Sequence, residues 1–289
     1  MWLRFAARQL ARILLITLAA GFLGAALVRF SPGFDTDERD LDARLSAASH
    51  EADARARAGE RNVVAFYGHW LSAALHGDFG TSRTMHRPVA TLIAERYAVT
   101  LRMIAAGGFA GLLAGLIGAI VAAWRRTAWV DNLLSPANGA LLSAPPAVVA
   151  LIFLWLNLDP ALAIAIAVGP YVFRYAHNLL REAAASPHVL TARARGLRES
   201  RICLAHVLLP ALPQLAAVIG IAATAAVGAV IPVEVICDRP GLGQLAWQAA
   251  LSRDMQALVA ITVMITVVIV GLNSISEAAL AARPERAGV

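Results

Sequence analysis

Four arginines stand close together in the stretch TARARGLRESR, residues 191–201, which separates two long apolar runs. Guanidinium groups pair with carboxylates and phosphates, so the stretch could contact an acidic partner or lipid headgroups. It could also be a topology signal that holds one loop in the cytoplasm. The arginines alone therefore leave three interpretations open: a docking surface, a lipid anchor and a topology signal.

The residues between the arginines favour docking. On a single helix through residues 188–203, one narrow face would consist of small residues, namely Ala192, Gly196, Ser200 and Cys203. Such a face fits the groove of a partner, whereas a pure topology signal needs only the arginines. Gly196 could instead end one short helix in a left-handed cap, with a second helix beginning near Arg198.

Other reactive residue types lack the spacing that catalysis or metal binding requires. The sequence has no Gly-x-x-x-x-Gly-Lys phosphate loop, no His-Glu-x-x-His motif and no Gly-x-Ser-x-Gly nucleophile elbow. Its seven histidines are scattered, and Cys203 and Cys237 lack metal-ligand spacing. We therefore expect no catalytic residue, no metal site and no cofactor bound by this chain.

Three residues in the apolar runs are candidates for a transport path or gate. Glu234 is the main ionisable residue there, and intramembrane acids are functional candidates, although this one could be merely solvated or paired. Pro145 and Pro146 interrupt another run, because proline frees carbonyls and kinks a helix. The sequence does not distinguish a fixed kink from a conformational hinge.

Apolar helices must position all of these residues. The 289 residues are 59% hydrophobic and 15% charged, and the mean hydropathy of +0.65 indicates an all-α polytopic membrane protein. Six runs are long enough to span a bilayer: 10–30, 99–123, 133–156, 160–180, 206–233 and 257–280. The first is too long for a cleaved signal sequence, so we interpret it as a retained span.

The placement of the arginines predicts the orientation. Arginines gather at both chain ends, at residues 125–126 and in the 181–201 loop, so we expect these parts in the cytoplasm. This clustering also makes nucleic acid a poor explanation of the net charge of +6. Segment 31–98 is then external. Aromatic and apolar residues recur at helical spacing within 63–74, which predicts a helix at the membrane interface, with a substrate-binding aromatic cage as the alternative.

Small residues at intervals of four predict close helix packing in two spans. The second span carries Gly107, Gly111 and Gly115, and the fifth repeats the device with Gly220, Thr224 and Gly228. Small residues at this spacing let two helix backbones approach closely in lipid. We expect these faces to serve packing, not chemistry.

Several segments resemble one family in the same order along the chain. TARARGLRESRICLAHVLLPAL is similar to the cytoplasmic EAA-type loop of binding-protein-dependent ABC importer permeases, and most closely to the dipeptide/oligopeptide/nickel branch. The other similar segments are RFSPGF, HWLSAALHGDFGTSRTMHRPVATLIAERYAVTL, AAWRRTAWVDNLL and VEVICDRPGLGQLAWQAALSRD. The resemblance implies a type I ABC importer (MetI-like) permease fold with six transmembrane helices.

The resemblance also implies partners. A second, homologous permease subunit would complete the path in the bacterial inner membrane, two cytoplasmic ATPase subunits would hold ATP and Mg, and an external binding protein would deliver peptides or a related solute such as nickel. The matched loop would be the coupling helix that contacts an ATPase. Its five candidate contact residues are Ala192, Arg193, Arg195, Gly196 and Arg198, the last standing where the branch usually has a Ser N-cap.

We therefore expect four parts: an N-terminal transmembrane helix (1–30), an external segment with an interfacial helix (31–98), a five-helix permease core (99–280) with a coupling loop at 182–205, and a cytoplasmic tail (281–289). Two other functions stay open at this point. One is a membrane anchor or scaffold without transport, and the other is a membrane-embedded enzyme, for which the sequence shows no paired polar or metal-binding residues at mid-membrane depth.

Overall fold

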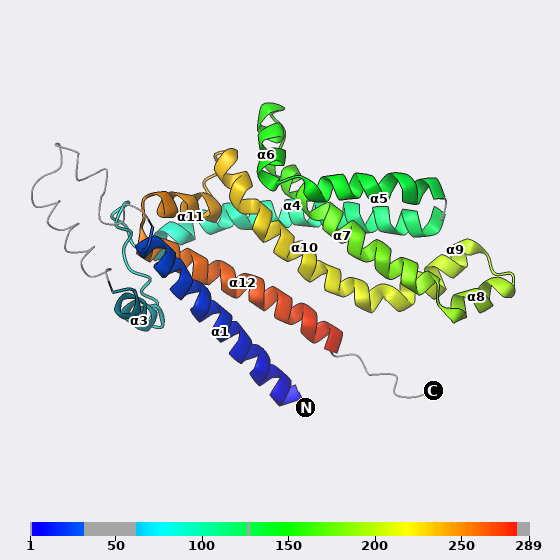
Figure 1. Ribbon diagram of the computed structural model, residues 1–289, viewed down its shortest axis with the longest axis horizontal. Coiled ribbons are helices and arrows are strands. Elements are labelled where there is room, and N and C mark those ends of the chain that lie inside the picture. Colours follow the sequence, from blue (N-terminus) through cyan, green and yellow to red (C-terminus); the bar gives the residue numbers. More distant parts are fainter. Residues whose placement is uncertain (1, 32–61, 126–127, 282–289) are drawn as a thin grey trace, which may run out of the picture. The chain divides into compact units, whose positions relative to one another are not determined.

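Helices form nearly all of the structure that the computed structural model describes, which covers residues 2–31, 62–125 and 128–281 (Figure 1). Within these ranges the only β-type pairing is a single bridge between Thr81 and Pro88. This confirms the all-α fold class, because apolar runs in a bilayer must satisfy their backbone groups internally. Most of the charged first half of the external segment, and the tail from residue 282, lie outside the described residues.

One compact unit consists of Met1–Val99 and Pro240–Val270. Its elements are α1 (Trp2–Arg29), α3 (Val63–Ala74), the first turns of α4 (Val89–Arg125), α11 (Leu242–Leu251) and the first part of α12 (Met255–Ala281). Asp254 directly precedes α12 and connects its start to the segment around Ser82. Its buried carboxylate accepts hydrogen bonds from Ser82 Oγ at 2.5 Å, from the Thr84 amide at 3.2 Å and from the Ala257 amide at 3.2 Å. The last of these is a helix N-cap.

Helix α3 confirms the predicted helix within 63–74, but its aromatic face contacts protein where we expected the membrane interface. The Tyr67 hydroxyl donates to the carbonyl of Leu18 in α1 at 3.0 Å. Trp70 stacks on Tyr67 with ring centroids 6.0 Å apart, and its indole N–H donates to Phe79. Burial raises the pKa of Tyr67. The face therefore holds α3 on α1, which also disfavours an open aromatic cage.

The second unit consists of Thr100–Arg239 and Gly271–Val289. It contains the remaining parts of α4 and α12, together with α5 (Ala128–Ser143), α6 (Pro146–Trp155), α7 (Pro160–Ala184), α8 (Pro187–Ala194), α9 (Glu199–Arg201), the π-helical segment η2 (Ile202–Leu208) and α10 (Leu209–Ile236). Helix α10 packs against both α6 and α7, and α5 packs against α7.

The glycines of α4 pack closely on α7, as their spacing predicts. A Cβ on Gly111 would stand 2.7 Å from the carbonyl oxygen of Ala165, and a Cβ on Gly115 would stand 2.6 Å from that of Gly169. Gly107 meets the Ala161 carbonyl in the same way. The two backbones therefore approach within a distance that only glycine on α4 permits.

Gly228 in α10 makes no such contact with the described residues of this chain. No atom lies within 4 Å of the place where its Cβ would be, because this residue borders a cavity. Gly220 is buried in α10, and its carbonyl accepts a hydrogen bond from Thr224 Oγ1 at 2.9 Å. Equal spacing of small residues thus gives close packing in α4 and an open wall in α10.

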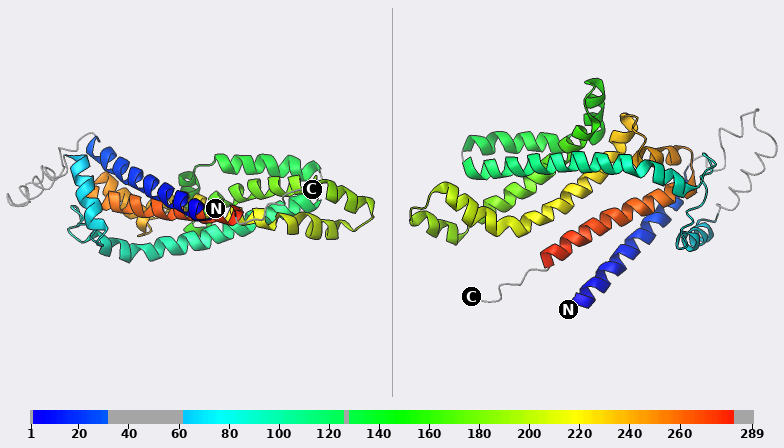
Figure 2. Two further views of the ribbon diagram at one scale, coloured as in Figure 1. Left: turned by 90° about the horizontal axis from the view of Figure 1, so that it is seen from below. Right: turned by 180° about the vertical axis from the view of Figure 1, so that it is seen from behind.

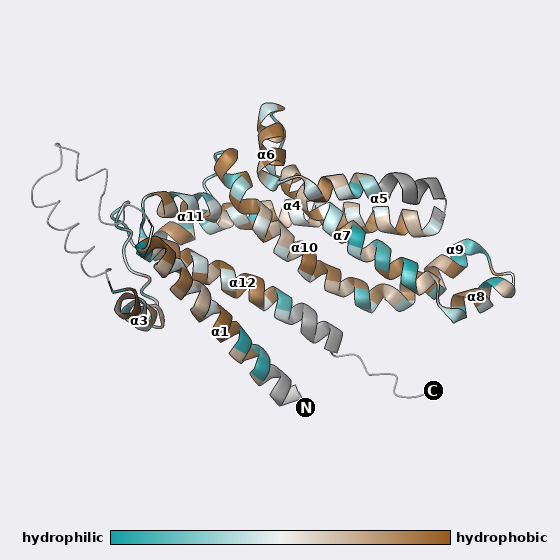
Figure 3. Ribbon diagram, in the orientation of Figure 1, coloured by the Kyte–Doolittle hydropathy of each residue, from teal (hydrophilic) through white to brown (hydrophobic). Residues whose placement is uncertain are grey.

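Four of the described helices are long and apolar enough to cross a membrane by themselves, in segments Ala7–Arg29, Val89–Trp124, Glu199–Ile236 and Met255–Ser274. A fifth span is possible if α5 and α6 count as one broken span. The predicted fourth span, 160–180, corresponds to the 25-residue helix α7, whose second half contains Arg174 and His177 and is partly hydrophilic (Figure 3). The structure is compatible with six spans but does not confirm that number.

The run 133–156 is interrupted at its prolines, as predicted, and the interruption is a complete break of the helix. It breaks between Ser143 and Pro146, and the two halves meet at 89° (Figure 1). Pro145 and Pro146 both lack an N–H, so the helix cannot continue through them. The turn to α7 also follows from the sequence, because Asp159 caps α7 by accepting from the Ala161 amide at 2.9 Å and Pro160 stands at the first helical position.

Candidate functional site

The basic loop folds into two short helices joined at Gly196, which has a φ of +72°. The Gly196 amide donates to the Arg193 carbonyl at 2.8 Å, and the Leu197 amide donates to the Ala192 carbonyl at 3.3 Å. These two bonds form a Schellman cap, in which glycine takes the left-handed position. The interpretation with two helices is therefore confirmed, and the single helix through 188–203 is wrong. We call residues 187–201 the elbow.

The break at Gly196 also removes the predicted face of small residues. Ala192 is only 5% exposed and lies on the inner side of α8 with the fully buried Val189. Gly196 is exposed at the tip of the elbow. Because the chain reverses direction at the glycine, the two residues do not share one outward face.

The arginines of the elbow divide into two groups. Arg193 forms an ion pair with Glu199, with Nε 2.9 Å from Oε1, and this pair joins α8 to α9 across the cap. Arg195 and Arg198 are exposed beside Gly196. Arg198 occupies the N-cap position of α9 without a side-chain capping bond, as expected for a residue that replaces Ser there. The outward surface of the tip is thus basic.

A π-helical segment connects the elbow to the long helix α10. Pro210 has no N–H to give to the carbonyl of His206, four residues earlier, and its ring would clash with that carbonyl in an α-helix. The segment η2 widens the helix at this point, with the Leu209 amide bonded to the Leu204 carbonyl five residues back. The His206 carbonyl instead lies 3.0 Å from Nε2 of His188 in α8. This bond fastens the elbow to the base of α10.

The elbow lies at one end of the second unit, beyond the ends of α7 and α10, in every view (Figures 1 and 2). Two of its connections to the base of α10 are the continuous helix backbone and the hydrogen bond between His188 and the His206 carbonyl. Sequence reasoning missed this histidine, although Pro210 placed four residues after His206 was a usable signal.

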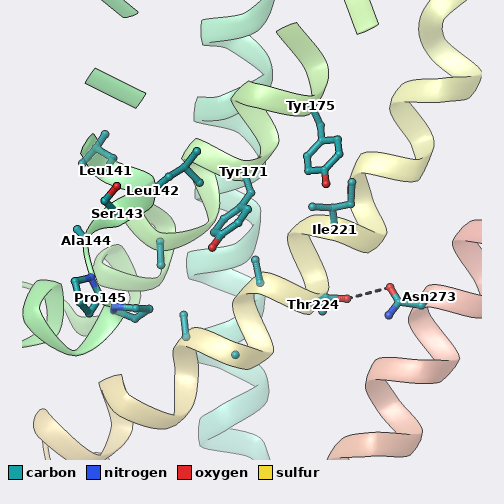
Figure 4. Close-up of a pocket in the computed structure, with 15 residues that line it drawn as sticks. Leu141, Leu142, Ser143, Ala144, Pro145, Tyr171, Tyr175, Ile221, Thr224 and Asn273 are labelled. Carbon is teal, nitrogen blue, oxygen red and sulfur yellow. Dashed lines mark hydrogen bonds between the residues drawn. The ribbon is translucent and has the colours of Figure 1, made fainter. Parts of the chain in front are cut away.

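A cavity of about 620 Å³ in the second unit lies between α5, α6, α7, α10 and α12 (Figure 4). Its wall is formed by Leu141, Leu142, Ser143, Ala144, Pro145, Pro146, Ala167, Tyr171, Tyr175, Ile221, Thr224, Ala225, Gly228, Ala229 and Asn273. The polar groups are hydroxyls and one amide. No residue on this wall carries a formal charge at neutral pH.

The structure brings two of the three path candidates to this cavity. Pro145 and Pro146 form part of its wall at the break between α5 and α6. Glu234 lies elsewhere in the unit: it is fully buried, and its Oε1 accepts a hydrogen bond from Thr100 of α4 at 2.6 Å. It therefore connects α10 to α4 and does not face the cavity.

Sequence reasoning named Thr224 only as a packing residue and did not single out Tyr171, Tyr175 or Asn273, which share the cavity wall with it. Tyr171 and Tyr175 come from α7. The Tyr175 hydroxyl points toward Ile221 of α10, and the Tyr171 hydroxyl points into the space on the side of the break between α5 and α6 (Figure 4). Thr224 Oγ1 lies 3.1 Å from Oδ1 of Asn273 in α12. The tyrosine pair has a sequence signal, since residues four apart share a helix face, but nothing local connects it to Asn273.

Comparison with known proteins gives a family match. Residues 111–283 match the family described as binding-protein-dependent transport system inner membrane component. The chain is 27% identical to the oligopeptide transport system permease protein OppB of Mycobacterium tuberculosis over 328 residues, covering 99% of both chains. It is 26% identical to the glutathione transport system permease protein GsiC of Escherichia coli over 232 residues, covering 74% of this chain and 76% of that protein. The matched region contains both the elbow and the cavity.

Proposed function

The chain belongs to the family of binding-protein-dependent transport system inner membrane components, and from this premise we propose that it moves peptides through the membrane as the permease subunit of an ATP-driven importer. The observation that carries the proposal is the extent of the family match, which includes the helices around the cavity and the basic elbow. The names of the two relatives, which refer to oligopeptides and glutathione, support a peptide cargo.

Membership in this family confirms the permease fold of the type I (MetI-like) class that the resemblance implied, and with it a multi-pass protein of the inner membrane. It also confirms that the chain is a transport subunit and not an enzyme, which removes the membrane-embedded hydrolase from consideration. A family defined by dependence on a binding protein works with that protein and with an energy-coupling ATPase.

The elbow is the contact with the ATPase in this proposal. Gly196, Arg195 and Arg198 form its exposed basic tip, which suits an acidic or hydrogen-bonding cleft. Ala192 and Arg193 have a different task, because one packs inward and the other holds the elbow closed through Glu199. Movement of the tip on ATP binding reaches α10 through η2 and shifts the helices between inward-open and outward-open states.

The remaining assembly follows from the same proposal. Two cytoplasmic ATPase subunits bind ATP and Mg, and this chain binds no cofactor. A second, homologous permease subunit forms a heterodimer with this chain and completes the path. Both termini and the elbow face the cytoplasm, and the external binding protein approaches the opposite side. In this topology residues 1–30 form the N-terminal transmembrane helix, 31–98 the external segment, 99–280 the permease core and 281–289 the cytoplasmic tail.

The test uses the complete complex in proteoliposomes. Reversing the charge of the tip with Arg195→Glu and Arg198→Glu together should abolish peptide-stimulated ATP hydrolysis and ATP-dependent uptake, because two exposed cations that meet the ATPase become anions. The matched control exchanges the internal pair, Arg193→Glu with Glu199→Arg, which keeps the ion pair and the elbow and should keep most activity. Full activity of the complex with the charge-reversed tip would refute the docking role. A wild-type complex that hydrolyses ATP but takes up no peptide would favour the alternative of a scaffold without transport.

A further inference from the structure

One wall of the cavity in the second unit is formed by the break between helices α5 and α6. Helices α5 and α6 meet at 89° around Ala144 and Pro145, and residues 141–146 form one wall. Pro146 has no N–H for the carbonyl of Leu142, four residues earlier, so this part of the wall presents backbone oxygen that an unbroken helix would have used. Irregular backbone at membrane depth is tolerated where it is buried in protein or lines a water-filled cavity.

The opposite wall adds neutral hydrogen-bonding side chains at the same level. Tyr171 lies near the middle of α7 (Pro160–Ala184), and Thr224 lies near the middle of α10 (Leu209–Ile236). The Oδ1 of Asn273 faces Thr224 Oγ1, which leaves the amide nitrogen directed away from that pair (Figure 4). The wall therefore offers hydroxyls that both donate and accept, an amide that donates, and a carbonyl that accepts.

The chemistry of this wall selects among cargoes. A nickel ion prefers imidazole, thiolate and carboxylate ligands, and none of the residues that line the described cavity supplies one. An uncharged amide group, with one donor and one acceptor, matches the hydroxyls and the amide of the wall. The volume of about 620 Å³ lies within the range that pockets for small ligands have.

We propose that this cavity is a station on the transport path where Tyr171, Tyr175, Thr224 and Asn273 bind the backbone amide groups of a peptide. The inference rests on the proposed function and makes it more specific. The permease here recognises the neutral backbone that all peptides share, so it accepts many sequences. Selection by charge or by side chain belongs to other parts of the importer.

The experiment measures uptake by the complete complex with its own binding protein and ATPases. The probes are alanine peptides of two to five residues, each paired with an analogue in which one internal or C-terminal alanine is replaced by N-methylalanine, which removes one backbone N–H and keeps the side chain. The measured quantity is the ratio of the two uptake rates at saturating binding protein. The same binding protein serves every variant, so its own preference cancels when variants are compared.

The variants remove one polar group each: Tyr171→Phe, Tyr175→Phe, Thr224→Val and Asn273→Leu. The Tyr171, Tyr175 and Thr224 variants each remove a hydroxyl that can accept from a peptide N–H, so each should lower the preference for the unmethylated peptide about 2- to 10-fold, the factor expected for one lost hydrogen bond. Asn273→Leu removes a donor to a peptide carbonyl, so it should slow the uptake of both peptides and leave their ratio unchanged. Tyr97→Phe is the matched control, because Tyr97 is an exposed tyrosine outside the cavity, and its ratio should equal that of the wild type. Apparent melting temperatures are measured beside the ratios, since a variant that only loses stability leaves the ratio unchanged.

The outcomes separate the two proposals. Wild-type complex that imports none of these peptides contradicts the peptide importer itself. Wild-type complex that imports them, with the three hydroxyl variants Tyr171→Phe, Tyr175→Phe and Thr224→Val all keeping the wild-type ratio, overturns the station and leaves the importer in place. A lower ratio in these hydroxyl variants, with Tyr97→Phe unchanged, supports the station.

Discussion

Replacement of Gly111 by alanine tests the close approach of α4 and α7 most directly. The added Cβ would stand 2.7 Å from the Ala165 carbonyl oxygen and 2.8 Å from Val168 Cβ. Ordinary contacts of a Cβ begin at 3.4 Å, so the two helices must separate by several tenths of an ångström at this point. The opposing atoms are a backbone oxygen and a β-branched side chain, neither of which can swing aside.

The expected cost follows from this geometry. Overpacking a tight contact typically destabilises a protein by roughly 1–3 kcal/mol. The gain in helix propensity from Gly to Ala, about 1 kcal/mol in water, offsets part of this. Gly139→Ala on α5 makes the same chemical change where no atom lies within 4 Å of the new Cβ. The difference between the two variants therefore isolates the steric term, roughly 1–3 kcal/mol.

The assay is the apparent melting temperature of the purified complex in detergent, followed by loss of the intact size-exclusion peak. For a domain of this size each kcal/mol corresponds to about 2–4 °C, so Gly111→Ala should melt several degrees below Gly139→Ala. Helix content by circular dichroism should stay unchanged in both. Equal melting temperatures would show that α4 and α7 are not in close contact at Gly111, and the argument for the glycine row would fail.

Two further predictions concern the external side and the end of α10. Asp254→Ala removes the N-cap of α12 and leaves Ser82 Oγ without the acceptor that Asp254 provides. The apparent melting temperature of the complex should therefore fall by the equivalent of about 1–3 kcal/mol. Asp254→Asn keeps one acceptor oxygen, so its melting temperature should fall less. Burial raises the pKa of the Cys237 thiol, and nearby Arg239 partly opposes this shift. Because only the thiolate reacts, the rate of alkylation of Cys237 should rise with pH, and the pH at half-maximal rate should be higher than for a cysteine in the unfolded chain. A half-maximal pH at or below that of the unfolded chain would contradict the burial of this thiol.

Local sequence was sufficient for features that depend on near neighbours. The left-handed position of Gly196, the missing cap at Arg198 and the cap by Asp159 each depend on residues within a few positions. The sequence left two structures open for the basic stretch, and the Schellman cap shows that the two-helix form is the one adopted. The single helix failed because a residue with positive φ reverses the chain.

Features that depend on distant partners could not be predicted. Gly111 and Gly228 have the same kind of spacing, yet one faces the Ala165 carbonyl and the other faces a cavity. The difference depends on which helix lies opposite, and this information is absent from either span. Prolines predicted a kink in the run 133–156, but the angle of 89° depends on how α6 packs against α7 and α10.

The cavity is the clearest example of this limit. Its polar wall combines Tyr171, Thr224 and Asn273, which belong to three helices far apart in the sequence. A polar residue in an apolar run can be noticed, but its partners become visible only when the helices are assembled. Glu234 shows the reverse case, since the most conspicuous acid of the apolar runs is used to hold α10 on α4.

The π-helical segment changes how the faces of the long helix 199–236 must be counted. An α-helix turns by about 100° per residue, so one residue accommodated in a wider turn shifts the angular phase of everything after it by about that amount. A helical wheel drawn through Glu199 and Thr224 in one pass therefore places them at the wrong relative angle. The elbow and the cavity wall belong to one continuous backbone, but their residues follow different angular phases. The faces must therefore be assigned on two separate helical wheels, one for residues before Ile202 and one for residues after Leu208.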